Sequence, residues 1–72
     1  MIRITIRTDT DAFKDPYGKP DRASYTKEVR RVLLELLECL KVSQESGSRV
    51  VCTTLFDSLG NNVGDYEDDA NL

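Results

Sequence analysis

The sequence predicts a single α+β domain in which the elements follow the order strand, helix, strand, strand. Three patterns support this fold class: alternating apolar residues at the start of the chain, one long amphipathic stretch at Tyr25–Lys41, and two strand-like segments joined by a glycine-containing turn near the end. Seventy-two residues fit one domain. We place it at residues 1–72, with a folded core at 1–67 and an acidic tail at 68–72 that is expected to fray.

The opening segment has the pattern of a half-buried strand. Isoleucines and polar residues alternate, which puts the two kinds on opposite faces of a sheet. We expect Ile2, Ile4 and Ile6 to pack on the core, and Arg3, Thr5 and Arg7 to face solvent or a partner. A loop follows at Asp9–Pro20, where Asp, Gly and Pro interrupt regular structure. Its aromatic residues, Phe13 and Tyr17, are expected to fold back onto the helix or the sheet edge.

The stretch Tyr25–Lys41 predicts the central helix. On a helical wheel its apolar side chains fall within about 60° of Leu36 and form one core-facing stripe; they are Tyr25, Val29, Val32, Leu33 and Leu40. Asp21 or Ser24 is the expected N-cap, and Gly47 is the expected C-terminal stop.

Two side-chain patterns lie off this stripe. Arg31 stands three residues after Glu28 and four before Glu35, which allows ion pairs along the helix. Leu34 lies about 160° from Leu36, among charged residues, and Leu37 lies at about 100°, beside Arg30. We interpret Leu34 and Leu37 either as ordinary surface or as a patch for a partner or for a second copy.

The C-terminal third predicts a β-hairpin. Arg49–Asp57 reads as the second strand, Ser58–Asn61 as its turn, and Asn62–Glu67 as the third strand. The simplest sheet places the third strand between the first two and antiparallel to both. The helix then packs on one face of a three-stranded, mainly antiparallel sheet.

Charge is distributed unevenly. Residues 1–41 carry nine Lys/Arg and seven Asp/Glu, a net of +2, whereas residues 42–72 carry one Arg and six acids, a net of −5. This acidic half disfavours nucleic-acid binding. Its last acids are Asp65, Glu67, Asp68 and Asp69.

The residue inventory argues against most enzyme chemistry. Histidine is absent, which removes the usual general base and the common nucleophile pairs. Cys39 and Cys52 are interpreted as buried free thiols, and no glycine-rich phosphate loop occurs. Asp9, Asp11 and Asp15 lack the pattern of a calcium loop and are assigned to turn capping. We therefore expect no cofactor, no metal and no catalytic residues.

The chain resembles a group of small accessory proteins encoded in bacteriophages and prophages. That group combines an opening of the type strand-KTD-x-AF, an amphipathic helix, and an ending of the type L-x-D-x-x-G-N-x-V-G-x-[FY]-E. The resemblance spans most of the chain, which departs from it in the longer segment at 14–23 and in its Asp-rich end. It implies a phage-type accessory protein and assigns no catalytic residues. The matching residues are Thr8, Asp9, Ala12, Phe13, Asp57, Gly60, Asn61, Val63, Gly64, Tyr66 and Glu67.

These observations predict a small non-enzymatic binding protein that occupies a surface of a bacterial host protein. A defence complex is the expected target, as for an anti-CRISPR protein, and the host cytoplasm is the expected location, since no signal peptide or membrane-spanning stretch is seen. The expected anchors are on the helix, and acids of the C-terminal half are expected to steer association. The partner-binding residues are thus Arg30, Leu34, Leu37, Asp65, Glu67, Asp68 and Asp69.

Two alternatives belong to other functional classes. One is a structural homodimer joined through the helix face or the sheet edge, which would enlarge the thin core of so short a chain. The other is a weak nucleic-acid-binding module that uses Arg3, Arg7 and Arg49. No membrane partner is expected.

Overall fold

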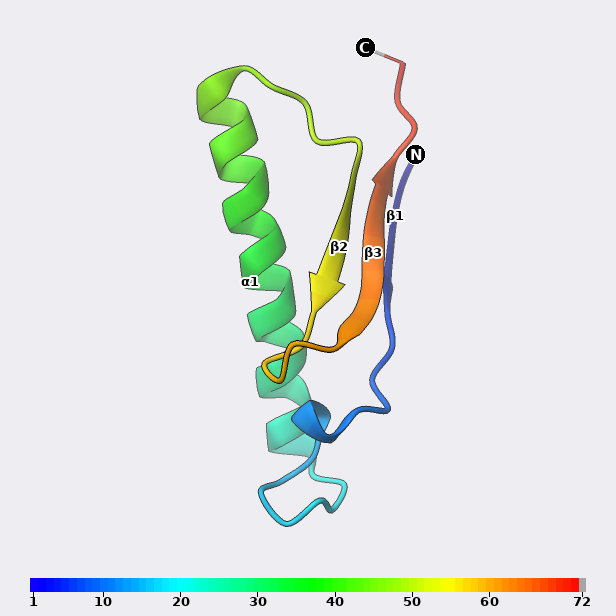
Figure 1. Cartoon of the computed structure of the whole chain (residues 1–72), viewed down its shortest axis with the longest axis vertical. Helices are drawn as coiled ribbons and strands as arrows, with labels where there is room; N and C mark the ends of the chain where they lie inside the picture. The colour runs from blue at the N-terminus through cyan, green and yellow to red at the C-terminus, as the bar shows by residue number, and fades with distance from the viewer. Residues whose placement is uncertain (72) are drawn as a thin grey trace.

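The structure, a computed structural model that describes residues 1–71, has one helix packed on a three-stranded sheet (Figure 1). Strand β1 (Ile2–Ile6) leads through a short 3-10 helix, η1 (Asp11–Phe13), to helix α1 (Arg22–Ser46). Strands β2 (Cys52–Phe56) and β3 (Asn62–Asp68) form the C-terminal hairpin. The sheet order is β1-β3-β2, and both pairings are antiparallel. The predicted α+β fold and the central position of the third strand are confirmed.

Helix α1 begins and ends at the residues that the sequence indicates. Asp21 is the N-cap, since its carboxylate accepts hydrogen bonds from the backbone N–H (2.9 Å) and the hydroxyl (2.7 Å) of Ser24. Gly47 ends the helix in the left-handed conformation, at a φ of 75°. Arg31 bridges Glu28 (2.9 Å) and Glu35 (2.7 Å), as the helical spacing predicts.

The strands of the hairpin differ from their predicted bounds. The second strand was expected at Arg49–Asp57, but β2 covers only Cys52–Phe56. Strand β3 extends one residue further than expected, to Asp68, whose amide donates to the Val51 carbonyl at 2.8 Å. The predicted tail at 68–72 is therefore partly strand. Its Asp69 amide also donates to Met1 (3.2 Å), while Leu72 lies outside the described residues.

The core lies between α1 and the β2–β3 hairpin, and β1 is at its margin (Figure 1). Ile6 packs against this core as expected. The same expectation is wrong for Ile2 and Ile4, which are 57% and 46% exposed. They lie on the helix side of the sheet, but α1 lies over β2 and β3. The buried apolar residues are Phe13, Val32, Leu36, Leu55, Val63 and Tyr66.

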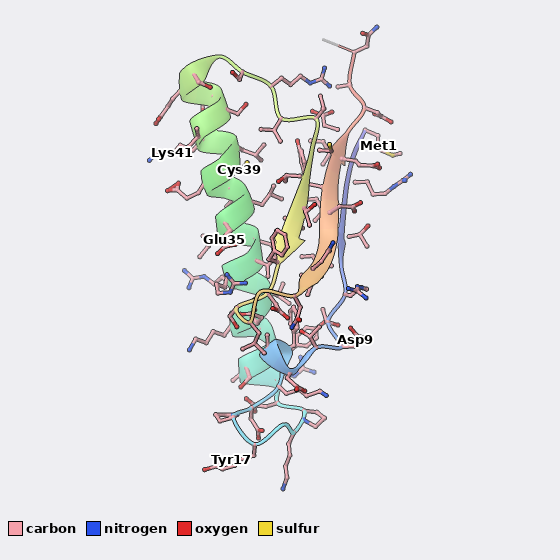
Figure 2. The ribbon with its side chains drawn as sticks, viewed as in Figure 1. Met1, Asp9, Tyr17, Glu35, Cys39 and Lys41 are labelled. Atoms are coloured by element: carbon pink, nitrogen blue, oxygen red, sulfur yellow. The ribbon has the colours of Figure 1, made fainter. Side chains whose placement is uncertain are left out.

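The loop before α1 supplies one core residue. Helix η1 buries Phe13, and its ring lies 6.0 Å from the ring of Tyr25, so the predicted folding back of Phe13 is confirmed. Tyr17 is 87% exposed and projects from the far end of the loop, so the same prediction is wrong for it (Figure 2). Asp15 caps the turn, as its carboxylate accepts from the amides of Tyr17 (2.9 Å) and Lys19 (2.8 Å).

Two buried carboxylates join the loop, the helix and the hairpin. Asp57 accepts hydrogen bonds from the Thr10 hydroxyl at 2.7 Å, the Leu59 amide at 2.9 Å and the Asn61 amide at 2.8 Å. Glu28, which the helical wheel places on a polar flank, is only 5% exposed and accepts from Arg31 and from the Ser58 amide at 2.8 Å. Both carboxylates are fully hydrogen-bonded, as buried charges must be.

Hydrogen bonding sets the charge state of these carboxylates. Burial alone would raise the pKa of Asp57, but hydrogen bonds from Asn61, Thr10 and Leu59 favour the ionised form and lower this pKa to about 2. Burial likewise opposes ionisation of Glu28, but hydrogen bonds from Arg31 and Ser58 hold its pKa below the ordinary value. Ionised Asp57 and Glu28 therefore stabilise the fold at neutral pH.

Gly64 marks a close approach between β3 and β1. A Cβ atom at this position would lie 1.8 Å from the carbonyl oxygen of Thr5 and 2.7 Å from its carbonyl carbon. We expect Gly64→Ala to lower the free energy of unfolding by at least about 2 kcal/mol, since β1 must shift to relieve the overlap. Urea denaturation measures this loss. Asp65→Ala, an exposed change on the same strand, is the control, and an equal effect of both would contradict the explanation.

The lowered pKa of Asp57 predicts that part of the free energy of unfolding is lost in acid. A carboxylate with a depressed folded-state pKa stabilises the fold above its unfolded value of 3.8, and this contribution is lost as the pH falls towards about 2. We expect Asp57→Asn to cost about 2 kcal/mol at pH 7 and progressively less below pH 4. Urea denaturation across this pH range tests it, with Asp65→Asn as the control. A difference from wild type that stays constant with pH would contradict the assignment.

Candidate protein-binding surfaces

The three predicted anchors lie together on the outer side of α1. Leu36 faces the sheet and is only 4% exposed, whereas Leu34 and Leu37 are 47% and 58% exposed. Arg30 is also exposed and precedes Leu34 by one helical turn. Lys41, which falls on the same part of the wheel as Leu34, points away from the sheet in Figure 2. We call Arg30, Leu34 and Leu37 the outer helix patch.

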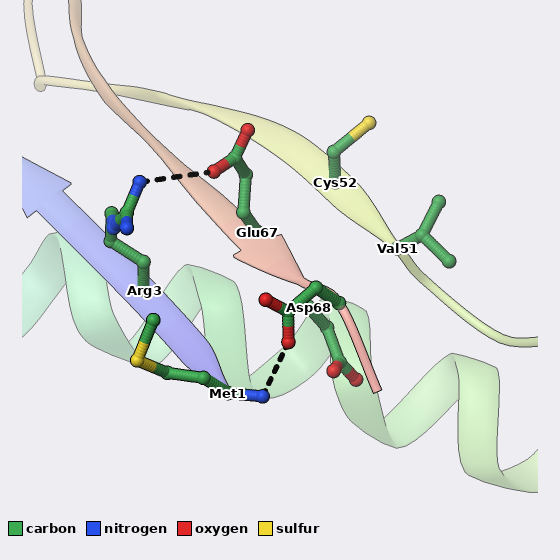
Figure 3. A pocket seen from close by; sticks show the side chains of 7 residues that line it. Met1, Arg3, Val51, Cys52, Glu67 and Asp68 are labelled. Atoms are coloured by element: carbon green, nitrogen blue, oxygen red, sulfur yellow. Dashed lines mark hydrogen bonds and ion pairs between the residues drawn. The ribbon is translucent and has the colours of Figure 1, made fainter. Parts of the chain in front are cut away.

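Two of the four predicted acids lie on the opposite side of the molecule. In β3, Asp65 pairs with Thr5 and Thr54, and Glu67 pairs with Arg3 and Cys52. Paired residues share a face, and alternation places them on the face that α1 does not cover. Arg3 lies 3.8 Å from Glu67 in an exposed ion pair (Figure 3). The open face of the sheet is thus mixed in charge.

The other two acids have partners within the chain. Asp68 is half-buried and lies 3.6 Å from the Arg49 guanidinium, and its carboxylate accepts from the Ala70 amide at 2.9 Å. Asp69 pairs with the N-terminal amine of Met1. The four acids therefore do not form one cluster. The outer helix patch and the pair Asp65 and Glu67 face opposite directions, so one flat partner surface cannot contact both.

The three arginines considered for nucleic-acid binding do not form one basic surface. Arg3 pairs with Glu67 on the open face, and Arg7 donates to the Asn62 carbonyl. Arg49 pairs with Asp68, whose position in β3 places it on the helix side of the sheet. Each guanidinium lies beside an acceptor, and for Arg3 and Arg49 this acceptor is an acidic side chain.

A further apolar surface was missed by the sequence interpretation. Glu35 and Cys39 line a hollow together with Thr53 and Leu55, so this flank of α1 faces β2. Leu37 falls on the opposite flank, towards the side of the sheet where β1 lies. There Ile2 and Ile4 are exposed. We call Ile2, Ile4 and Leu37 the β1 flank. No local sequence signal separates Ile2 and Ile4 from Ile6, because which of them the helix covers depends on where α1 crosses the sheet.

A hollow on the surface brings together charged groups from both ends of the chain. This hollow, of about 210 Å³, lies at the end of the sheet and contains the Arg3–Glu67 pair and the Met1–Asp69 pair, with Cys52 at its margin (Figure 3). Within residues 1–71, no group of three or more cysteine or carboxylate side chains is arranged to hold a metal ion. In the same residues, no helix combines the length and the apolarity that a membrane crossing requires.

The two cysteines differ in accessibility. Both thiols are free, as predicted, but Cys52 is exposed and Cys39 is half-buried, so the prediction that both are buried is wrong. In the native protein we expect a thiol reagent such as dithionitrobenzoate to label Cys52 first and Cys39 more slowly, because contact with the reagent requires exposure. Cys52→Ser should remove the fast phase only. Two equally slow phases would contradict the exposed position of Cys52.

Comparisons with known proteins give no relative from which a role for these surfaces could be taken. No protein-family model, no curated protein and no solved structure matches this chain.

Proposed function

We propose that this chain is a small non-enzymatic binding protein of phage type that occupies a surface of a bacterial host protein. The observation that carries the proposal is the outer helix patch. Leu34 and Leu37 expose about half of their surface on the part of α1 that lies away from the core, and Arg30 lies beside them. Large apolar side chains next to an arginine are a typical composition of binding hot spots.

The geometry separates the proposed contact surface on α1 from the acids proposed to attract the partner. Because Asp65 and Glu67 face away from the outer helix patch, they do not share its contact surface. Their role in the proposal is long-range: with a net charge of −3, the chain is attracted to basic surfaces before contact forms. Helix α1, with 25 residues, then docks lengthwise in a groove of the partner, in the manner of an amphipathic helix.

The resemblance to phage accessory proteins supports a phage-type protein, and the choice of target rests on what small phage accessory proteins often do. A protein complex of a bacterial defence system, as for an anti-CRISPR protein, is the proposed target, and the host cytoplasm is the proposed site of action. Inhibition by occupancy requires no catalytic group. The sequence has no histidine, the usual general base, and this mode of action needs none.

Affinity capture tests the proposal. The immobilised chain is incubated with nuclease-treated bacterial lysate, and bound proteins are identified by mass spectrometry. One stoichiometric host protein is expected. Recovery of no protein other than the bait, from strains that carry and strains that lack defence systems, would contradict the proposal.

A single substitution tests the binding surface. Leu34→Lys places a charge in the centre of the outer helix patch, and we expect it to weaken partner binding by about thirtyfold or more without changing the fold. Leu59→Lys is the matched control, since Leu59 is 64% exposed but lies in the hairpin turn. Calorimetry measures the affinities, and circular dichroism checks the fold. Equal affinities of Leu34→Lys and wild type would exclude this surface.

A further inference from the structure

The hydrogen-bonding groups of β1 divide into a paired and an unpaired set. The Arg7 amide donates to Val63 at 2.6 Å, and the Asp69 amide donates to Met1 at 3.2 Å, so the odd-numbered residues of β1 face β3. The backbone N–H and C=O groups of Ile2, Ile4 and Ile6 therefore point away from the sheet. Within residues 1–71 no hydrogen bond reaches them. β1 presents an open edge.

The other edge of the sheet, at β2, is partly covered. Helix α1 lies beside β2 (Figure 1), and its side chains Val32, Leu36 and Cys39 line a hollow with β2 residues. The Arg31 guanidinium donates to the Phe56 carbonyl, an outward-facing group of β2, at 2.8 Å. An open edge is a site at which another strand pairs, and proteins commonly cover or charge such edges. Here the β2 edge is partly covered, whereas β1 has no such cover within residues 1–71.

The open edge adjoins apolar surface. The residues whose backbone groups are unpaired, Ile2 and Ile4, also expose about half of their side chains on the helix side of the sheet. Leu37 adds exposed surface on the facing flank of α1. A strand added to this edge would gain both main-chain hydrogen bonds and apolar contacts, which is the combination used in β-augmentation.

The molecule as a whole exposes more surface than its mass requires. A compact monomer of 8.1 kDa exposes about 4,500 Å², whereas this chain exposes 5413 Å². Its radius of gyration is 13.8 Å, and its extents are 45 × 20 × 18 Å; a compact chain of this length has a radius of about 11 Å. The excess of about 900 Å² is close to the ~800 Å² that each partner contributes to a standard interface.

The sequence of β1 is complementary to itself in one register. If a second copy of β1 pairs antiparallel with the open edge, a two-fold axis relates the two strands, and the residue at the axis sets the register. An axis at Arg3 would place two arginines directly opposite each other, and an axis at Thr5 would place Arg3 opposite Arg7. Both arrangements are unfavourable, because like charges repel. An axis at Ile4 sets Ile4 on Ile4, Ile2 on Ile6 and Arg3 on Thr5. In the same register Arg7 lies opposite Met1, whose amine is neutralised by Asp69. Axes at Ile2 or Ile6 overlap fewer residues.

We propose that two copies of this chain pair antiparallel through β1, about a two-fold axis at Ile4, and form one continuous six-stranded sheet. The pairing closes the open edge and buries Ile2 and Ile4 of both copies between the two helices. It leaves Arg30 and Leu34 of the outer helix patch exposed, since they face away from the sheet, whereas Leu37 lies towards the second copy. A dimer would thus present two copies of the surface around Leu34.

Light scattering on the full chain, from micromolar to millimolar concentration, tests the oligomeric state. The expected mass is twice 8.1 kDa at the higher concentrations. Ile4→Lys sets two charges opposite each other at the axis and should give a monomer; Leu34→Lys is the matched control and should stay dimeric. A monomeric wild type throughout overturns the proposal, as does a dimer that survives Ile4→Lys. A monomer whose Ile2 and Ile4 amides gain protection from hydrogen exchange only with another protein also overturns it.

A cross-linking experiment tests the register without relying on a destabilising change. In a Cys39→Ala, Cys52→Ser background, Ile4→Cys places two thiols on residues whose Cα atoms lie about 5.5 Å apart in a hydrogen-bonded pair, within the range for a disulfide. We expect mild oxidation to link the chains fully. Leu34→Cys, in the same background, should stay uncross-linked. Failure of Ile4→Cys to link, or equal linking by both variants, overturns the register.

Discussion

A single helix has to cover a sheet of three strands, and the remaining features of the structure depend on this constraint. Helix α1 packs its apolar stripe on β2 and β3, because the hairpin supplies Leu55, Val63 and Tyr66 to the core. β1 then lies beyond the helix and is held mainly by its ladder with β3. The core therefore contains only a few large side chains, and one side of the sheet keeps exposed isoleucines.

Polar interactions compensate for this thin core. The carboxylate of Asp57 joins the hairpin turn to Thr10, and that of Glu28 joins α1 to the amide of Ser58. These two groups add polar connections between the loop, the helix and the hairpin to the apolar contacts of Phe13. Their depressed pKa values follow from the same hydrogen bonds, so the structure is coupled to the ionisation of side chains that take no part in the proposed binding.

The same constraint separates the surfaces that bear on function. The outer side of α1 exposes Leu34 and Leu37, the open face of the sheet carries Asp65 and Glu67, and the β1 flank exposes Ile2 and Ile4. Leu37 belongs to both the outer helix patch and the β1 flank, whereas Leu34 and Arg30 lie further from β1. A host protein centred on Leu34 and a second copy bound at β1 can therefore occupy one molecule together.

The sequence by itself determined the fold class and the ends of the helix. Alternation, the 3.6-residue period and the turn residues are local signals, and each depends on neighbouring residues only. They predicted the strand-helix-strand-strand order, the central third strand, Asp21 as one of two N-cap candidates and Gly47 as the stop. The exposure of Leu34 also followed from the helical wheel, since its position relative to Leu36 is fixed by helix geometry.

Only the tertiary structure decided which apolar residues are buried and which acids are free. Alternation places Ile2 and Ile4 on the helix side of the sheet, but whether the helix reaches them depends on where α1 crosses the strands. The sequence pattern places Glu28 on the surface, but in the structure the hairpin turn packs against it. The pattern also predicts that Asp68 and Asp69 belong to a free acidic tail, but in the structure they pair with Arg49 and with the N-terminus. These outcomes rest on contacts between residues far apart in the chain, which no local pattern encodes.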